Sequence, residues 1–273
     1  MAEQTYDVIV LDCPPTSEAL QFLSFSSTVD WYARKRLKMD RQLLKLARPL
    51  TKVLSESTQE LIPTDNYFAA VQDLFNNLEG VDQLLRDPAT TSVRLVTNPE
   101  KMVVRETQRA FMYFCMYGMN TDAVILNRLL PVNDGYFAQR AQAQADYAEN
   151  IRSYFDPVPV STLSYFAEEV VGLAQLEVFA AQLYDGRDAA AFFMEMPSYG
   201  FRKEAEQQYC LELRLPFVPK NQIDLSRNGE DMVVRIGTFK RNILLPRAIV
   251  PLRTESTGMH GDTLVVRFVG ERA

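Results

Sequence analysis

The residues with the clearest chemical meaning stand at the end of a short apolar run near the N-terminus. Val8 to Leu11 is too short for a buried helix and is rich in β-branched residues, which predicts a fully buried strand of a parallel sheet. Asp12 follows, and Pro14 and Pro15 end the strand because proline donates no ladder hydrogen bond. Ligands of open α/β sheets bind beyond the carboxyl ends of the strands, so Asp12 could meet a Mg²⁺-bound phosphate there. Its alternative role is to cap the helix that follows.

A second candidate, Asn127, lies in the apolar run 123–130, which predicts another strand. Residues 91–97 predict the strand before it, and a helix between the two is expected to end at Gly118. Strand, helix and strand joined by short loops indicate a βαβ unit with a right-handed crossover. From this pattern alone, an asparagine that closes a strand end or turn is the simpler interpretation of Asn127.

Composition excludes several classes of protein. The 273 residues are 47% hydrophobic and 23% charged, which is typical of one large or two smaller globular domains. A net charge of −6 argues against nucleic acid as a general partner, and no apolar run approaches a membrane span. Cys13, Cys115 and Cys210 are widely spaced, which predicts a reducing, cytoplasmic environment. With His260 as the single histidine, a histidine-based metal site or nucleophile pair is not expected.

The segment DVIVLDCPPTSEAL resembles the DTAPTGHTL-type stretch of the ArsA family of ATPases, which includes the arsenite-pump ATPase and the ATPase that targets tail-anchored membrane proteins. The resemblance implies that Asp12 orients a Mg²⁺-bound water and that Thr16 belongs to the second nucleotide-sensing switch. Ser17 and Glu18 stand where the family often has glycine and histidine. The loss of that glycine reduces backbone freedom at the switch.

Two further segments resemble the same family more closely, TSVRLVTNPEKMVVRETQRA and DAVILNRLLP. They imply that Asn127 contacts an adenine, with Arg128 beside it, and an asparagine amide offers the donor and acceptor that this requires. The stretch DPVPV resembles the segment that closes over the adenine, with Val158 and Pro159 as its wall. The cofactors implied by the resemblance are ATP and Mg²⁺.

Residues 17–86 correspond to the helical arm of that family. Within them, residues 31–54 predict an amphipathic helix with a basic face, kinked or ended at Pro49. The simpler interpretation is a surface helix whose basic face is solvated. The alternative is a docking surface for an apolar or membrane-proximal partner, since the arm lines a client groove in the targeting branch of the family.

The pattern changes after Gly200. Leu211, Leu213 and Leu215 alternate with charged residues, and several short strands separated by turn residues predict a small antiparallel sandwich. This part resembles the α-crystallin-like domain appended to some bacterial ArsA-type ATPases. The predicted domains are therefore residues 1–200 and 205–273.

The family's phosphate loop has no counterpart in these 273 residues. No glycine is followed by lysine, and the first glycine is Gly80. The expected fold is therefore a partial parallel sheet with helices on both faces, a truncated P-loop NTPase-like α/β domain, followed by the β-sandwich. A strand as apolar as Val8 to Leu11 would then present an unpaired edge, which predicts a protein partner that carries the missing half, or self-association.

Two functions follow from this resemblance. The first is an ATPase component that needs a partner chain to supply the phosphate loop, with ATP hydrolysis by this chain alone left open. The second is a non-catalytic module that binds apolar clients or assembles a complex, with a vestigial nucleotide site. A fragment of a longer gene product is a third interpretation of the same sequence.

Overall fold

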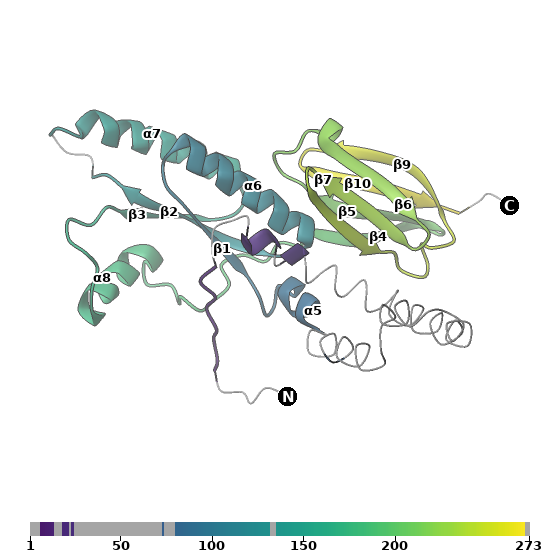
Figure 1. The fold of residues 1–273 in the computed structure, drawn as a ribbon, viewed down its shortest axis with the longest axis horizontal. Helices are drawn as coiled ribbons and strands as arrows, with labels where there is room; N and C mark the ends of the chain where they lie inside the picture. The colour runs from purple at the N-terminus through teal and green to yellow at the C-terminus, as the bar shows by residue number, and fades with distance from the viewer. Residues whose placement is uncertain are drawn as a thin grey trace, which may run out of the picture.

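The computed structural model describes residues 6–13, 18–21, 23–24, 73, 80–131 and 135–270 (Figure 1). The first part of the described chain alternates helices and strands: α5 (Val81–Arg86), β1 (Val93–Thr97), α6 (Lys101–Tyr117), β2 (Thr121–Leu129), α7 (Ala138–Phe155), β3 (Val160–Ser164) and α8 (Leu173–Tyr184). The second part is built of strands: β4 (Tyr199–Ala205), β5 (Gln208–Arg214), β6 (Ile223–Asn228), β7 (Asp231–Ile236), β8 (Phe239–Leu244), β9 (Arg253–His260) and β10 (Thr263–Val269).

The first three strands form a parallel sheet in the order β1-β2-β3. Helices α6 and α7 lie together on one face of this sheet, and α8 lies on the other (Figure 1). The predicted βαβ unit is present because each apolar strand is joined to the next through a helix of three or more turns. The prediction of a partial parallel sheet with helices on both faces is confirmed.

The remaining strands form two antiparallel sheets, ordered β4-β5-β10-β9 and β6-β7-β8. Alternate side chains of β5, β7 and β10 are buried, which is the period-2 pattern predicted for Leu211, Leu213 and Leu215. Three of the tight connections contain a glycine with positive φ, at Gly229, Gly237 and Gly261, and the β4–β5 connection has Gln207 in the same left-handed region. The predicted antiparallel sandwich is confirmed.

Helix α6 contributes side chains to the hydrophobic cores of both parts of the chain. Phe111 and Cys115 face a core made with α7 and the parallel sheet. Met112 and Met116, on the opposite side of the helix, belong to a second core formed mainly by sandwich strands. The helix is therefore buried on both sides along its C-terminal half, and the two parts of the chain pack as one body around it.

The C-terminal end of α6 is held by a buried arginine from the sandwich. The Arg241 guanidinium donates to the Met116 carbonyl and lies 4.1 Å from the centroid of the Tyr199 ring. Burial lowers the pKa of Arg241 to about 10, so the group stays charged at neutral pH beside the negative end of the helix dipole. Gly118 ends the helix at φ 84°, and a Cβ there would come within 2.8 Å of the Tyr199 ring. This position therefore requires glycine for conformation and for space.

The segment between the two parts is fixed by an ion pair at the amino ends of β1 and β2. The Asp122 carboxylate is fully buried, pairs with Arg94 at 3.2 Å and accepts from the Phe193 amide at 3.2 Å. Arg94 also donates to the carbonyls of Ala189 and Ala191, at 2.6 and 2.7 Å, and lies over the Phe193 ring. One charged pair thus bonds to three backbone polar groups of this segment.

An asparagine continues the same attachment. The Asn120 amide donates to the Met194 carbonyl at 2.9 Å and accepts from the Met196 amide at 3.0 Å, as a neighbouring strand would. Ser198 donates to the Met119 carbonyl at 2.7 Å. From the sequence, residues 186–199 are expected to be linker-like, with one further turn of helix over DAAAFFMEM as an alternative. The helical turn is wrong, because these backbone groups bond to side chains at the sheet edge instead.

The predicted buried strand from Val8 to Leu11 is also wrong. These residues are extended and exposed, with Val10 at 86%, and they pair with no strand in the described part of the chain. An apolar run forms a strand only where a neighbour offers its ladder of hydrogen bonds. The helix predicted from Glu18 is confirmed over its described residues, and its Leu20 and Leu23 are buried against α6. Most of the predicted arm, at 25–72 and 74–79, lies outside the described residues.

The Arg94–Asp122 pair makes a testable prediction. Replacing Asp122 with alanine leaves Arg94 half-buried without its carboxylate and should cost about 3 kcal/mol of unfolding free energy. Limited proteolysis should then cut within residues 188–198 several times faster than in the parent chain. The exposed Glu177→Ala is the matched control and should change neither urea midpoint nor cleavage rate. Parent-like cleavage of the Asp122 variant would contradict this account.

Candidate functional site

The carboxyl ends of β1, β2 and β3 meet at one edge of the parallel sheet, where ligands of such sheets bind. Asn98 follows β1, and Tyr165 follows β3. Asn127 and Arg128 lie near the C-terminal end of β2. Asn98 was not predicted as a ligand. It does not cap α6, whose N-cap is Glu100. The structure thus brings together polar and aromatic side chains from three strand ends.

The Asn127–Arg128 dipeptide forms a local irregularity in β2. The pairing with β3 shifts register between Leu126 and Leu129, and Arg128 adopts a left-handed φ of 60°. The Asn127 Oδ1 accepts the Arg128 amide at 2.8 Å, which satisfies a backbone donor that the bulge removes from the ladder. The Nδ2 group of Asn127 has no hydrogen-bond partner among the residues that the structure describes, so it can donate to a ligand.

Tyr165 and Phe166 extend this edge. The Tyr165 amide donates to the Leu129 carbonyl at 2.7 Å, so the chain beyond β3 runs beside the end of β2. The Tyr165 side chain is 57% exposed, and Phe166 stacks on Phe179 of α8 with centroids 5.8 Å apart. An exposed aromatic ring at the carboxyl edge can stack on the flat face of a base.

The predicted adenine wall lies at the other end of the sheet. Pro159 precedes β3, and its carbonyl accepts the Val124 amide at 2.9 Å. Val124 is three positions before Asn127, roughly 10 Å along the strand at 3.3 Å per residue. Val158 is buried in the core against Phe155. The structure therefore does not bring Val158 and Pro159 together with Asn127.

Asp12 and Thr16 are not placed at this edge by any observed contact. Asp12 is exposed in the extended N-terminal segment, and its carboxylate makes no hydrogen bond or ion pair within the described part of the chain. Thr16 lies outside the described residues. Their proposed roles in orienting water and sensing nucleotide stay predictions.

The sequence reasoning did not consider Tyr165 and Phe166, because it read residues 156–160 as a short strand or loop and assigned no strand to the residues that follow. Pro157 and Pro159 carried the signal that could have corrected this, since proline is excluded from a central strand. With the strand moved to Val160–Ser164, its carboxyl end falls directly before Tyr165.

The rest of the described chain offers no metal-binding cluster or membrane-spanning helix, and its Cys115 thiol is buried. Burial raises the pKa of the Cys115 thiol to about 12, which makes it a core residue rather than a nucleophile. Among the described residues, no group of three or more histidine, cysteine, aspartate or glutamate side chains is arranged so that it could hold a metal ion. None of the helices that the structure describes combines the length and the apolarity needed to cross a bilayer.

Comparison with known proteins identifies the fold. A family profile described as "Anion-transporting ATPase" (ArsA ATPase) matches residues 1–185. The chain belongs to the ArsA ATPase family. A second profile, the "HSP20-like domain found in ArsA", matches residues 206–268 of this ArsA-family chain and covers strands β5 to β10. The resemblance stated from the sequence is confirmed for both parts.

Individual ArsA-family relatives agree with this assignment. The "Putative arsenical pump-driving ATPase 1" of Aquifex aeolicus is 36% identical over 270 residues, which is 97% of this chain and 67% of that protein. The "Putative arsenical pump-driving ATPase" of Chlorobaculum tepidum is 33% identical over 90% of this chain and 61% of its own length. "ATPase GET3" of Chaetomium globosum is 27% identical over 66% of this chain and 54% of its own. The chain thus spans between about half and two thirds of these relatives.

The bulge at Asn127 makes a prediction about stability. Asn127→Ala removes the acceptor of the Arg128 amide and should cost about 1 kcal/mol of unfolding free energy. Asn127→Asp keeps that acceptor and should leave stability within about 0.5 kcal/mol of the parent. Urea titrations followed by circular dichroism compare the two variants. Equal losses from both would show that the Oδ1 contact contributes nothing to the bulge.

Proposed function

We propose that this chain supplies the base-binding half of an ArsA-type ATPase, while polypeptide outside residues 1–273 supplies the phosphate loop. The observation that carries the proposal is the position of both residues at the carboxyl edge: the Asn127 Nδ2 group has no hydrogen-bond partner among the described residues, and the exposed Tyr165 follows β3 with its amide bonded to the Leu129 carbonyl of β2. An amide donor and a stacking surface suit a purine, whose ring nitrogens accept hydrogen bonds and whose faces are flat.

The same edge is poorly suited to a triphosphate. Arg128 is the cation on the β2 bulge, and the printed sequence has no glycine followed by lysine to cradle phosphates. Phosphoryl transfer depends on positioning and on neutralising charge, so these residues alone cannot hold ATP and Mg²⁺ in a reactive geometry. By family resemblance, Asp12 would contribute a water-mediated contact to Mg²⁺ once the phosphates are held.

Nucleotide binding tests the base half of this proposal. The purified chain should bind a fluorescent ATP analogue weakly, and Tyr165→Ala should lower the affinity about fivefold by removing a stacking face. Asn127→Asp keeps the bulge but replaces the Nδ2 donor with an acceptor, so it should weaken binding to a similar extent. Val158→Ala, at the opposite end of the sheet, would be a poor control because it opens the core. Phe192→Ala, which removes an exposed aromatic at the amino edge of the sheet, is the matched control and should bind like the parent.

Complementation tests the phosphate half. The chain alone should show no ATP turnover above background, and turnover should appear when it is mixed or co-expressed with a polypeptide that carries the missing loop. Asp12→Ala should abolish this restored turnover without lowering analogue affinity. Enzymatic turnover by the chain alone, or failure of the mixture to turn over, would overturn the proposal of divided halves.

A second candidate function, nucleotide-independent binding of apolar clients, is favoured by helix α8. Its exposed apolar side chains include Leu173 at 80% and Val178 at 60%, next to Val171 at 71%. Exposed apolar surface of this kind marks interaction sites. In this reading the nucleotide site is vestigial, and the HSP20-like part and α8 hold unfolded or apolar segments, in a cytoplasmic setting.

An aggregation assay separates this candidate from the first. The chain should suppress thermal aggregation of a model enzyme without nucleotide, and Leu173→Glu with Val178→Glu should remove about half or more of that effect by charging the apolar face. Gln182→Glu adds a charge to the same helix at an exposed polar position and should leave suppression unchanged. Suppression that requires ATP would instead support the first proposal.

A further inference from the structure

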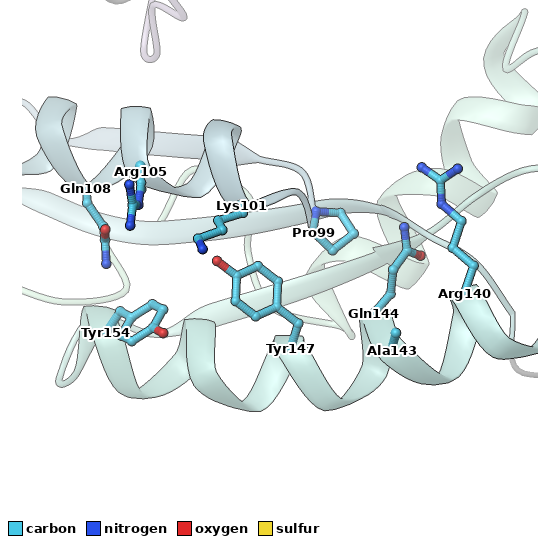
Figure 2. A pocket seen from close by; sticks show the side chains of 9 residues that line it. All are labelled: Pro99, Lys101, Arg105, Gln108, Arg140, Ala143, Gln144, Tyr147 and Tyr154. Atoms are coloured by element: carbon cyan, nitrogen blue, oxygen red, sulfur yellow. The ribbon is translucent and has the colours of Figure 1, made fainter.

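An open groove of about 740 Å³ lies between α6 and α7, on the helical layer that covers one face of the parallel sheet (Figure 2). The residues that give it its character are Lys101, Arg105 and Gln108 of α6 and Arg140, Tyr147 and Tyr154 of α7. Lys101 and Tyr147 point towards one another across it, and Arg140 lies at the end nearest the carboxyl edge of the sheet (Figure 2). Neither Asn127 nor Tyr165 lines this groove.

The groove concentrates positive charge that the protein does not neutralise. Its lining contains three cations and no carboxylate. None of Lys101, Arg105 and Arg140 forms an ion pair within the described part of the chain. On the same two helices but outside the groove, Arg109 pairs with Glu106 at 3.3 Å and Arg152 pairs with Glu149. The charges in the groove are therefore left available on a chain whose net charge is −6.

The shape of the groove suits an extended chain. Helices α6 and α7 both follow a strand of the parallel sheet and run in the same direction, so the groove is linear (Figure 2). Its lining on α7 runs from Arg140 to Tyr154, which is roughly 21 Å at 1.5 Å per residue. About six residues of extended peptide cover that distance. Small-molecule sites are instead enclosed, whereas this groove is open.

We propose that the α6–α7 groove binds an extended acidic segment of a partner protein. The three cations would pair with carboxylates, and Tyr147 and Tyr154 would pack against the side chains between them. Tyrosine and arginine are the residues that dominate protein–protein binding energy, and both are concentrated here. Nucleic acid is the weaker choice, because a chain of net charge −6 lacks the broad basic surface that phosphate backbones require.

Fluorescence polarisation with a labelled octapeptide of alternating glutamate and alanine tests this proposal on the full chain. Binding should weaken as salt rises, and Arg105→Glu with Arg140→Glu should lower affinity about tenfold or more because like charges then face the peptide. Lys101→Ala should weaken binding more mildly. Arg152→Glu makes the same charge change on α7 outside the groove and should change affinity less than about twofold.

Three results would overturn the proposal. The first is no salt-sensitive binding of the octapeptide. The second is an equal loss of affinity in the Arg152→Glu control, which would show attraction to general surface charge. The third is tighter binding of a single-stranded DNA octamer, or of phosphatidylglycerol vesicles, with the same dependence on Arg105 and Arg140. Because all of these side chains lie at the surface, unchanged circular dichroism and urea midpoints should accompany each variant.

Discussion

The architecture depends on burying one helix from two sides. Helix α6 presents Phe111 and Cys115 to the core of the parallel sheet and Met112 and Met116 to the core of the sandwich. Such a helix cannot be solvated along either side without exposing large apolar side chains, so each part of the chain needs the other in place. The buried Arg241, which bonds to the C-terminal end of the same helix, fixes the angle at which the sandwich meets it.

This constraint explains why the connection between the two parts is held rather than free. Backbone groups that pass close to a sheet edge need hydrogen-bond partners, and several of those in residues 188–198 bond to Arg94, Asn120 and Asp122 at the amino ends of β1 and β2. The linker is thus attached at the edge opposite to the candidate base site. The carboxyl edge stays uncovered by this segment and remains open to ligands.

The sequence predicted the parts of the fold in which local pattern and tertiary context agree. Apolar runs predicted the two strands that the structure has at Val93–Thr97 and Thr121–Leu129. A glycine at the end of the apolar periodicity predicted that the helix between them ends at Gly118. Val8 to Leu11 has equal apolar content but no neighbouring strand in the described chain, so the pattern was insufficient. The Arg94–Asp122 attachment joins residues 28 positions apart to a third segment, and no local signal could reveal it.

Of the two residues that we propose for the base site, the sequence pointed to one. Asn127 was predicted from its motif and its place near a strand end, and its role stays a prediction. Tyr165 was not considered, because residues 156–160 were read as a short strand or loop although proline is excluded from a central strand.

The distribution of charge then separates two surfaces that a family assignment alone would not. Asn127, Arg128 and Tyr165 lie at the carboxyl edge, while Lys101, Arg105 and Arg140, which form no ion pair in the described part of the chain, line the groove between α6 and α7. A nucleotide base needs an amide donor and an aromatic ring, whereas an acidic polypeptide needs cations. The two surfaces can therefore bind different ligands at the same time.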